Sequence, residues 1–313
     1  MMSDIRVLAI VLLLIVPGCI SNDIPVDGIT DEEVVELEAC NGGGEYCLRT
    51  YDNVTFPETH NAFSTHEDGI FYPASNHETG LTAQWNAGMR AFMLDTHYTS
   101  QFANNPSNVA FCHGDDGRGF SPCRYGEVDP WDWLGQMKTF MEASPRDIVT
   151  LLVENDVEPD HLKLLFDDVG LSDWMYVHEL NTPWPTLLEL IESETRLVVF
   201  WEQLADELHP WFHDFNIFSW TTDYAEQDTS DMNCEVHRGD GEQPVFHMNS
   251  WLSGPLGLSD PDRADQANDP DFLVERGIEC IELHGKRPTF IAVDWWEDGD
   301  VVEAARRINE LDL

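Results

Sequence analysis

The stretch Val54-Thr55-Phe56-Pro57-Glu58-Thr59-His60-Asn61-Ala62-Phe63-Ser64 decides how this chain folds. It is a short β-branched and aromatic run that ends in Thr-His-Asn. This is typical of a strand that delivers an imidazole and an amide to the mouth of a site. Three later apolar runs also end in polar groups: Leu94-Asp95-Thr96-His97, Phe111-Cys112-His113-Gly114 and Leu152-Val153-Glu154-Asn155. Four successive runs of this kind predict a parallel barrel whose strand ends carry the chemistry.

From Tyr51 onward, strand and helix signals alternate. The expected strands are Val54–Phe56, Ala91–Leu94, Val109–Cys112, Ile148–Glu154, Leu197–Trp201, Ile217–Trp220, Val245–Met248 and Phe290–Val293. The expected helices are Thr82–Ala87, Trp131–Glu142, Asp160–Asp168, Thr186–Glu192, Asp262–Ala267 and Val301–Leu311. This alternation predicts an α/β fold, a closed (β/α)8 TIM-type barrel that forms a single domain over residues 51–313. An open, doubly wound sheet is the alternative, but no Gly-x-Gly-x-x-Gly motif follows an early strand, which counts against a dinucleotide fold.

The composition indicates one large, very acidic domain. The chain has 313 residues, of which 42% are hydrophobic, and this is enough for a full core. Asp and Glu number 59 against 16 Lys and Arg, for a formal net charge of −43. Such a surface repels nucleic acid, so we expect no nucleic-acid partner, and a saline (halophilic) setting would screen its self-repulsion. The eleven Trp residues argue against a disordered acidic chain.

The N-terminus is typical of an exported protein. Arg6 precedes the apolar run Val7 to Val16, which is too short for a transmembrane helix of ~20 residues but suits a signal-peptide core. Val16-Pro17-Gly18-Cys19 resembles a lipoprotein signal, in which Cys19 is lipidated and becomes the new N-terminus. We therefore expect a signal peptide over 1–19 and an acidic tether and extension over 20–50. An ordinary secretory signal is the alternative.

Cysteine usage also favours export. Apart from Cys19, six cysteines remain, and an even number in an exported chain indicates disulfides. Local spacing favours Cys40–Cys47 and Cys112–Cys123, which leaves Cys234–Cys280 as a long-range pair. Six cysteines allow fifteen pairings, so other connectivities stay open. A zinc site is the alternative, but no Cys-x-x-Cys pair supports it.

Several of these motifs resemble a known family. Thr59-His60-Asn61, Gly88-Met89-Arg90 leading to Leu94-Asp95, Cys112-His113-Gly114 and Leu152-Val153-Glu154-Asn155 occur in the order seen in the X-domain of phosphatidylinositol-specific phospholipase C. The later Trp184-Pro185-Thr186-Leu187, Leu197-Val198-Val199-Phe200, His247-Met248-Asn249 and Phe290-Ile291-Ala292-Val293-Asp294 resemble its secreted phosphodiesterase branch. Each motif is short, and their order from about Tyr51 to Leu313 makes the set specific.

The resemblance implies a barrel of β/α units that cleaves phosphodiesters with two histidines. Position by position, His60 matches the histidine that takes a proton from the attacking hydroxyl group. His113 matches the one that gives a proton to the leaving alkoxide. Histidine suits both roles because its unperturbed pKa of ~6.5 lets a pair share acid and base work near neutrality. Otherwise His113 would be a packed histidine beside the Cys112 disulfide.

The resemblance also implies how the phosphate charge is neutralised. Calcium-dependent members of the family use an Asn after the first His, acidic residues at the second strand end and a Glu at the fourth. Asn61, Asp95 and Glu154 match this pattern, and all three supply the oxygen ligands that Ca²⁺ prefers. One departure is Met93, which stands where calcium-dependent members usually have an acidic residue. Alternatively, Asp95 orients His60 and no metal is held there.

Other strand ends supply candidates for substrate contact. His97 follows Asp95, His247 and Asn249 share one face at the end of the seventh expected strand, and Asp294 follows the last strand. We expect these four residues to bind substrate, with a rim position for His97 and core hydrogen bonding for His247 and Asn249 as the alternatives. Arg90 fits a structural role better. His237-Arg238-Gly239 follows no apolar strand, so we assign it no function.

Together these patterns predict an exported phosphodiesterase that acts on a phosphoinositide-like or phospholipid-like substrate with calcium as cofactor. We expect a monomer on the extracellular face of the membrane, held by a lipid anchor at Cys19, or else secreted. A catalytically idle barrel that binds a ligand at the cell surface is the alternative. A glycosidase is less consistent with two histidines, and no Gly-x-Ser-x-Gly motif supports a serine esterase.

Overall fold

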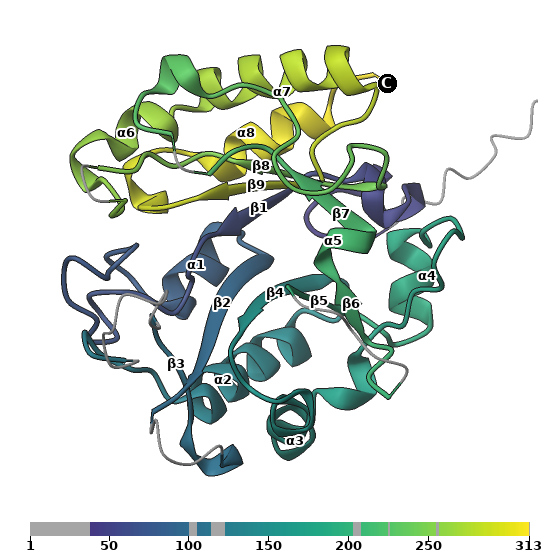
Figure 1. The fold of residues 1–313 in the computed structure, drawn as a ribbon. Helices are drawn as coiled ribbons and strands as arrows, with labels where there is room; N and C mark the ends of the chain where they lie inside the picture. Colours follow the sequence, from purple (N-terminus) through teal and green to yellow (C-terminus); the bar gives the residue numbers. More distant parts are fainter. Residues whose placement is uncertain are drawn as a thin grey trace, which may run out of the picture. The chain divides into compact units, whose positions relative to one another are not determined.

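The computed structural model describes residues 38–99, 105–113, 123–202, 208–224, 226–254 and 257–312. Over these residues the sheet has nine strands: β1 (Phe56–Thr59), β2 (Ala91–Tyr98), β3 (Val109–Phe111), β4 (Val149–Asn155), β5 (Leu197–Trp201), β6 (Phe212–Asp214), β7 (Ser219–Thr221), β8 (Val245–Asn249) and β9 (Phe290–Val293). Eight of them are parallel, in the order β6-β5-β4-β2-β1-β9-β8-β7, and β3 pairs antiparallel with β2 (Figure 1).

The eight parallel strands form the TIM-type barrel that the sequence predicts. β6 and β7 stand at the two ends of the hydrogen-bonded order, and over the described residues no ladder joins them. The single-turn helix α5 (Phe215–Phe218) connects these two strands directly. The order places β1 between β2 and β9, so the His60 motif lies beside the ends of both strands.

One expected barrel strand has a different place. The run Val109–Cys112 forms β3, which lies antiparallel to the end of β2, with Phe111 opposite Thr96. The eighth barrel strand is β6 instead. The sequence does not predict β6, because two of its three residues are polar and no apolar run marks it. The other seven expected strands correspond to barrel strands, although β1 begins at Phe56 and β7 at Ser219.

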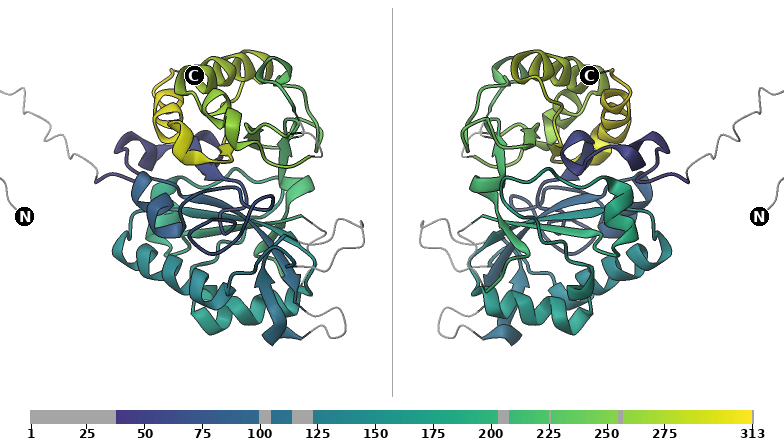
Figure 2. Two further views of the ribbon diagram at one scale, coloured as in Figure 1. Left: turned by 90° about the vertical axis from the view of Figure 1, so that its left-hand side faces the viewer. Right: turned by 90° about the vertical axis from the view of Figure 1, so that its right-hand side faces the viewer.

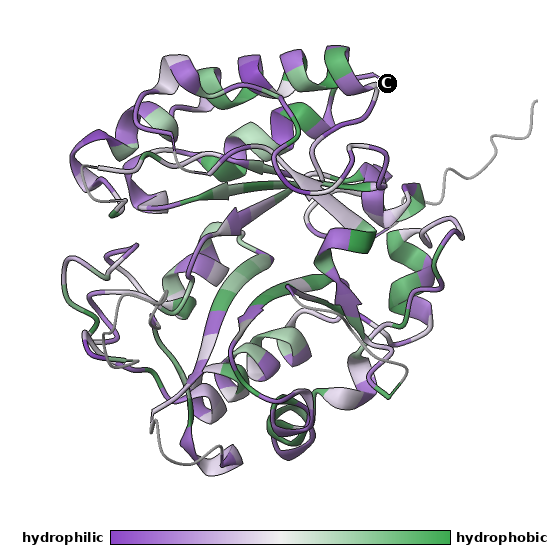
Figure 3. Cartoon of the chain, viewed as in Figure 1, coloured by the Kyte–Doolittle hydropathy of each residue, from purple (hydrophilic) through white to green (hydrophobic). Residues whose placement is uncertain are grey.

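Side chains alternate between the two faces of each strand, so the strands contribute to two separate hydrophobic clusters. Phe56, Leu152, Phe200 and Phe290 belong to one buried cluster, and the Phe200 and Phe290 ring centroids lie 6.4 Å apart although β5 and β9 are not neighbours. This cluster fills the barrel interior. The opposite strand faces belong to a second cluster that also contains helix residues, so they pack against the surrounding helices. Figure 3 shows hydrophobic stretches on the strands and helices in which hydrophobic and hydrophilic residues alternate.

Helices surround the barrel. Besides α5 they are α1 (Leu81–Ala87), α2 (Pro130–Ala143), α3 (Pro159–Val169), α4 (Leu187–Glu192), α6 (Ala264–Ala267), α7 (Pro270–His284) and α8 (Val301–Asn309). Asp129 caps α2 by accepting from the backbone N–H groups of Trp131 and Asp132, as the Asp-Pro start predicts. Thr186 and Glu189 form a capping box at α4.

The sequence does not predict α7, the longest helix that the structure describes. Its buried side includes Arg276 and Gly277, a charged residue and a helix breaker, which hide the apolar periodicity. Gly277 is needed because α8 approaches closely: a Cβ at this position would lie 2.5 Å from Cδ1 of Ile308. Figures 1 and 2 show α7 and α8 side by side on one flank of the barrel.

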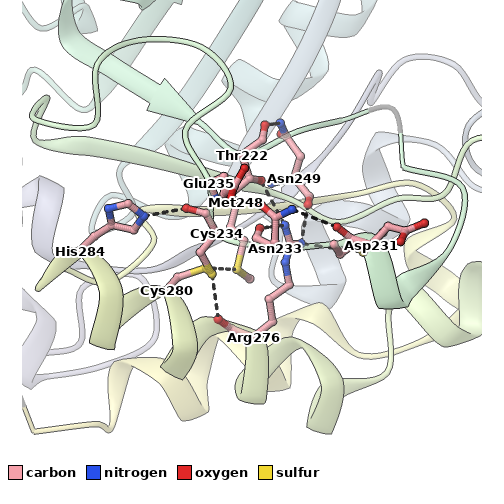
Figure 4. Close-up of a disulfide and its surroundings, with 11 residues drawn as sticks. Thr222, Asp231, Asn233, Cys234, Glu235, Met248, Asn249, Arg276, Cys280 and His284 are labelled. Atoms are coloured by element: carbon pink, nitrogen blue, oxygen red, sulfur yellow. Dashed lines mark hydrogen bonds between the residues drawn. A yellow bond between two sulfur atoms is a disulfide. The ribbon is translucent and has the colours of Figure 1, made fainter.

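The six described cysteines form three disulfides, in the pairing that the spacing favours. Cys40 joins Cys47, Cys112 joins Cys123, and Cys234 joins Cys280. Figure 4 shows the third bond, which ties the segment before β8 to α7. Beside it, the buried Arg276 guanidinium donates to the backbone oxygens of Asn233 and Asn249. Three disulfides are typical of proteins from an oxidising compartment.

The predicted signal peptide, Cys19 and most of the tether lie outside the described residues. Residues 40–50 contribute Cys40, Tyr46 and Cys47 to the interior cluster of the barrel. Asn41 holds them there through two hydrogen bonds with the backbone of Ile148, just before β4. Among the described helices, none has the length and apolar character needed to cross a membrane.

Candidate active site

Neighbouring strand ends bring His60 and Asp294 together. Thr59 of β1 is in register with Val293 of β9, so the residues that follow them leave the barrel side by side. The His60 backbone N–H donates to the Val293 oxygen at 3.0 Å, which fixes the start of the loop. The His60 Nδ1 atom then lies 2.8 Å from Oδ1 of Asp294.

Asp294 is a buried partner of His60. Its side chain is 3% exposed, and its oxygens also accept from Nδ2 of Asn76 and Oγ of Ser259. Burial raises the pKa of Asp294, but the charge and hydrogen bond of His60, the charge of His77 and the hydrogen bond of Ser259 together lower it overall, so the carboxyl group is ionised near neutrality. Burial lowers the pKa of His60, but the charge and hydrogen bond of Asp294, with the charges of Asp95 and Glu58, raise it overall.

This geometry corrects the expected role of Asp294. We expected it to touch substrate, but both of its oxygens are already engaged by protein donors. It also corrects the alternative for Asp95, because the partner that orients His60 is Asp294. The sequence could not show this, since the two residues are 234 positions apart and meet only through the β1–β9 ladder.

His113 is held by a second carboxylate. Its Nδ1 atom lies 3.2 Å from Oδ2 of Asp95, whose strand β2 is adjacent to β3. Burial raises the pKa of Asp95, but the hydrogen bond and charge of His113, with the charges of His60 and His97, lower it overall. The Nε2 atom of His113 faces Oδ1 of Asn76 at 3.0 Å. The side chains of His60 and His113 are 21% and 29% exposed, so solvent reaches both rings.

The ring nitrogens of the two histidines face different partners. Nδ1 of His60 faces an ionised carboxylate and therefore carries a hydrogen, whereas its Nε2 atom faces Nδ2 of Asn61 at 3.2 Å and accepts from it. Both ring nitrogens of His113 lie opposite oxygen atoms, Nδ1 opposite Oδ2 of Asp95 and Nε2 opposite Oδ1 of Asn76. Trp251 stacks on His60, with centroids 4.1 Å apart and planes at 3°.

The three expected metal ligands converge on the same barrel end. Asp95 is in register with Glu154, so both side chains leave the same face of neighbouring strands. The charge of Asp95, followed by burial and the charge of Glu202, raises the pKa of Glu154 to about 9, although part of the Glu154 side chain is exposed. The buried Asn61 turns its Nδ2 atom toward His60, which leaves its oxygen available.

Two adjacent carboxylates and one amide oxygen suit a cation that prefers oxygen ligands. The mutual repulsion of Asp95 and Glu154 is what a bound cation would relieve. In the described part of the chain, no group of three or more His, Cys, Asp or Glu side chains is placed to hold a metal ion, so the expected site depends on Asn61 and water as further ligands. Met93 adds no oxygen: it packs against the interior cluster instead.

The expected substrate contacts separate into two groups. His97 lies near His113, because the charge of His113 adds to the effect of burial in lowering the pKa of His97. Its Nδ1 atom, however, is bound to Asp156 at 3.0 Å. His247 is 1% exposed inside the barrel, and its Nδ1 atom lies 3.1 Å from Oε2 of Glu58. The alternative of core hydrogen bonding therefore holds for His247, because a ligand on the rim cannot reach it.

Asn249 is likewise a buried residue and not an open contact. Its backbone N–H and side-chain Nδ2 both donate to Thr222, and its backbone oxygen accepts from Nη1 of Arg276. Arg238, by contrast, reaches the rim although we assigned it no function. Its Nη1 atom lies 2.5 Å from Oε1 of Glu202, directly after β5, and it is a cation near Glu154. No strand signal precedes Arg238, so periodicity could not find it.

We expect the Cys112–Cys123 disulfide to matter more for activity than for stability. Cys112 directly precedes His113, and the Cys123 backbone N–H donates to the His113 oxygen. A double Cys→Ser change here should lower kcat about 10- to 100-fold, because it frees the backbone of His113, a candidate catalytic residue, and small displacements of such a group are costly. The matched change at Cys234 and Cys280, which close a longer loop, should lower Tm more and kcat little. Equal kcat values for the two variants would contradict this assignment.

Three comparisons place this chain among known proteins. Residues 46–309 match the family model described as PI-PLC X 1. The chain is 27% identical over 293 residues to PI-PLC X domain-containing protein 1 of Arthroderma benhamiae, covering 87% of this chain and 90% of the relative. It is 24% identical over 300 residues to a protein of the same fungus named uncharacterized secreted protein, covering 87% of this chain and 64% of that relative.

A solved structure has the same fold. The phosphatidylinositol-specific phospholipase C of Staphylococcus aureus superimposes with a TM-score of 0.56 at 14% sequence identity, covering 85% of this chain and 94% of the other. The family match extends from the disulfide-bonded segment before β1 to the end of α8, and so includes every strand of the barrel. This chain belongs to the PI-PLC X domain family.

Proposed function

We propose that this protein is an exported phosphodiesterase in which His60 is the general base and His113 the general acid. One observation carries the proposal: His60 and His113 are each bound through Nδ1 to a buried carboxylate of their own, Asp294 and Asp95 respectively. A binding module has no need for two such pairs. The Nε2 atom of His60 faces an amide donor and that of His113 an amide oxygen, and this difference supports opposite roles for the two rings in one proton-transfer sequence.

In the proposed reaction, Nε2 of His60 takes the proton of a hydroxyl group next to the phosphate, or of water. That oxygen forms a bond to phosphorus, and the bond from phosphorus to the leaving oxygen breaks. Nε2 of His113 gives its proton to the leaving oxygen. Asp294 stabilises the imidazolium that forms at His60, and Asp95 holds the His113 ring in place for the transfer.

Calcium is the proposed cofactor, held by Asn61, Asp95 and Glu154. When bound, the ion would offset the negative charge that develops on the phosphate oxygens. The chain supplies a formal charge of −2 from the two carboxylates and an amide oxygen, with room for water and substrate oxygens among six to eight ligands. The raised pKa of Glu154 supports the proposal, because a site that lacks a cation penalises the second negative charge.

Metal binding can be tested apart from catalysis. Without a carboxylate at Met93, we expect a Kd for Ca²⁺ of ~10⁻⁴ to 10⁻³ M. Met93→Glu should tighten binding and Glu154→Gln should weaken it, measured by calorimetry on chelator-treated protein. Arg306→Gln, on α8, changes an exposed charge away from these ligands and should leave the Kd unchanged. Full activity without divalent ions, together with no heat of binding, would reject the metal.

The proposed substrate is a phospholipid or another phosphodiester, met at the extracellular face of the membrane or in secreted form. The three disulfides and the secreted name of one relative support export. A lipid anchor at Cys19 would keep the enzyme, as a monomer, next to lipid substrates. Intact mass should show a lipid on Cys19 and no free thiols, and Cys19→Ser should release the protein from membranes.

The substrate class is tested with purified protein. A panel should contain vesicles of phosphatidylinositol and of phosphatidylcholine, soluble glycerophosphodiesters and bis(p-nitrophenyl) phosphate, each with and without a chelator. A phosphate monoester and an aryl glycoside serve as controls for other hydrolase classes. Turnover of diesters alone supports the proposal. Tight binding of a diester without turnover would favour the idle barrel, and cleavage of the glycoside would favour a glycosidase.

A further inference from the structure

Asn76 stands between the two histidine pairs. It lies in the loop between β1 and α1, is 5% exposed, and belongs to no motif that the sequence singled out. Its Nδ2 atom donates to Oδ1 of Asp294 at 2.8 Å, the same oxygen that accepts from His60. Its Oδ1 atom lies 3.0 Å from Nε2 of His113. One amide therefore links both pairs.

The chemistry of its neighbour fixes which way this amide points. An ionised carboxylate only accepts hydrogen bonds, so the NH₂ group of Asn76 must face Asp294. The amide oxygen then has to face His113, and because this oxygen only accepts, it holds the Nε2–H of that ring in one direction. No other uncharged side chain of this size offers a donor and an acceptor on opposite sides of one planar group.

The backbone of Asn76 is held as firmly as its side chain. Its N–H donates to the oxygen of Ser64 at 2.8 Å, and its oxygen accepts from the N–H of Trp295 at 2.7 Å. The loop after β1 and the segment after β9 therefore both fix its position. These two backbone hydrogen bonds hold Asn76 from two different segments, unlike a loop residue that contacts only solvent.

We propose that Asn76 is a positioning residue that joins the His60–Asp294 and His113–Asp95 pairs into one rigid unit. This inference rests on the proposed roles of the two histidines. Through Asp294 it keeps the His60 ring directed at the nucleophile. Through its oxygen it keeps the His113 Nε2–H aimed into the site until the leaving oxygen of a bound substrate replaces that acceptor.

The test uses two variants and a matched control. Asn76→Ala removes both contacts, and Asn76→Ser keeps a polar group that is too short to reach both partners. Asn268→Ala is the control: this residue is also buried, and its Nδ2 atom donates to the backbone oxygens of Asp294 and Trp295. It steadies the same segment but touches neither histidine among the contacts of the described residues.

For the diester that the wild-type protein cleaves best, both Asn76 variants should lower kcat about 10- to 100-fold and leave KM within about twofold, because misplaced catalytic groups slow the chemical step. Asn268→Ala should lower Tm but change kcat per folded molecule less than about threefold. A kcat loss in Asn76→Ala no larger than that in Asn268→Ala would overturn the proposal.

A measurement without substrate separates this inference from the proposed function. Proton NMR of the wild-type protein should show a ring N–H of His113 protected from exchange, assigned by its loss in His113→Ala. That signal should disappear in Asn76→Ala and persist in Asn268→Ala. If it is protected but no diester is cleaved, the positioning contact stands and the proposed function fails. If it is unprotected in the wild type, the positioning role is wrong whatever the activity.

Discussion

Replacing either His60 or His113 with alanine should lower kcat/KM about 10²- to 10⁴-fold, because general acid–base groups typically contribute this much each. The two rings serve one displacement at phosphorus, with His60 removing a proton and His113 supplying one. The double variant should therefore be far less impaired than the product of the single effects predicts. Both rings are partly exposed, so the loss should not come from unfolding.

The control for this experiment is His161→Ala. His161 is also a hydrogen-bonded histidine, with Nδ1 at 2.6 Å from the Tyr98 hydroxyl group, but it lies on α3 outside the site. It should retain most of the activity. Thermal melts of all variants establish the folded fraction. If either His60→Ala or His113→Ala turns over a diester at a near wild-type rate, the acid–base assignment is wrong.

The second large effect is expected at Asp294. Asp294→Asn keeps the shape of the side chain but removes the charge that stabilises the imidazolium at His60, so kcat should fall about 10²- to 10⁴-fold. The sign of the pH effect follows from the pKa shift. The charge of Asp294 raises the pKa of His60, so its removal lets His60 lose its proton at lower pH, and the acid limb of kcat/KM should move to lower pH.

Asp147→Asn is the matched control for this change. Asp147 also pairs with a cation, at 2.7 Å from Nε of Arg90, but it precedes β4 at the opposite end of the barrel. Its replacement should lower Tm without moving the acid limb. An unchanged acid limb in Asp294→Asn would mean that His60 is not the base, whereas a shift to higher pH would contradict the sign of the coupling.

The sequence predicted what depends on local pattern. Alternating runs indicated the barrel, and polar residues at the run ends identified His60, Asp95, His113 and Glu154, all of which the structure places at one end of the barrel. Only the strand order could reveal that Asp294 partners His60, since β1 and β9 are far apart in the chain. The two-residue period of a strand places His247 on the inward face, but it does not show how far inside the barrel the side chain lies.

The site residues that the sequence did not predict come from irregular segments. Asn76 and Arg238 come from loops without periodicity, where a residue's neighbours depend on how the chain turns and not on its spacing. The opposite error occurred at β3, whose apolar run resembles a barrel strand but pairs antiparallel on β2. The helix α7 was not predicted because its buried side contains the charged residue Arg276, which breaks the apolar periodicity. Tertiary hydrogen bonds hold this residue in place.

The central claim, that two oppositely disposed histidines cleave a phosphodiester, is tested most directly by phosphorus NMR. Purified protein with Ca²⁺ is followed in time with phosphatidylinositol and with a soluble diester, and the His60→Ala/His113→Ala protein serves as the blank. We predict that the wild type converts a diester resonance into that of a cyclic phosphate or a monoester while the blank leaves it unchanged. Unchanged diester resonances with the wild type, or equal conversion by the blank, would contradict the account.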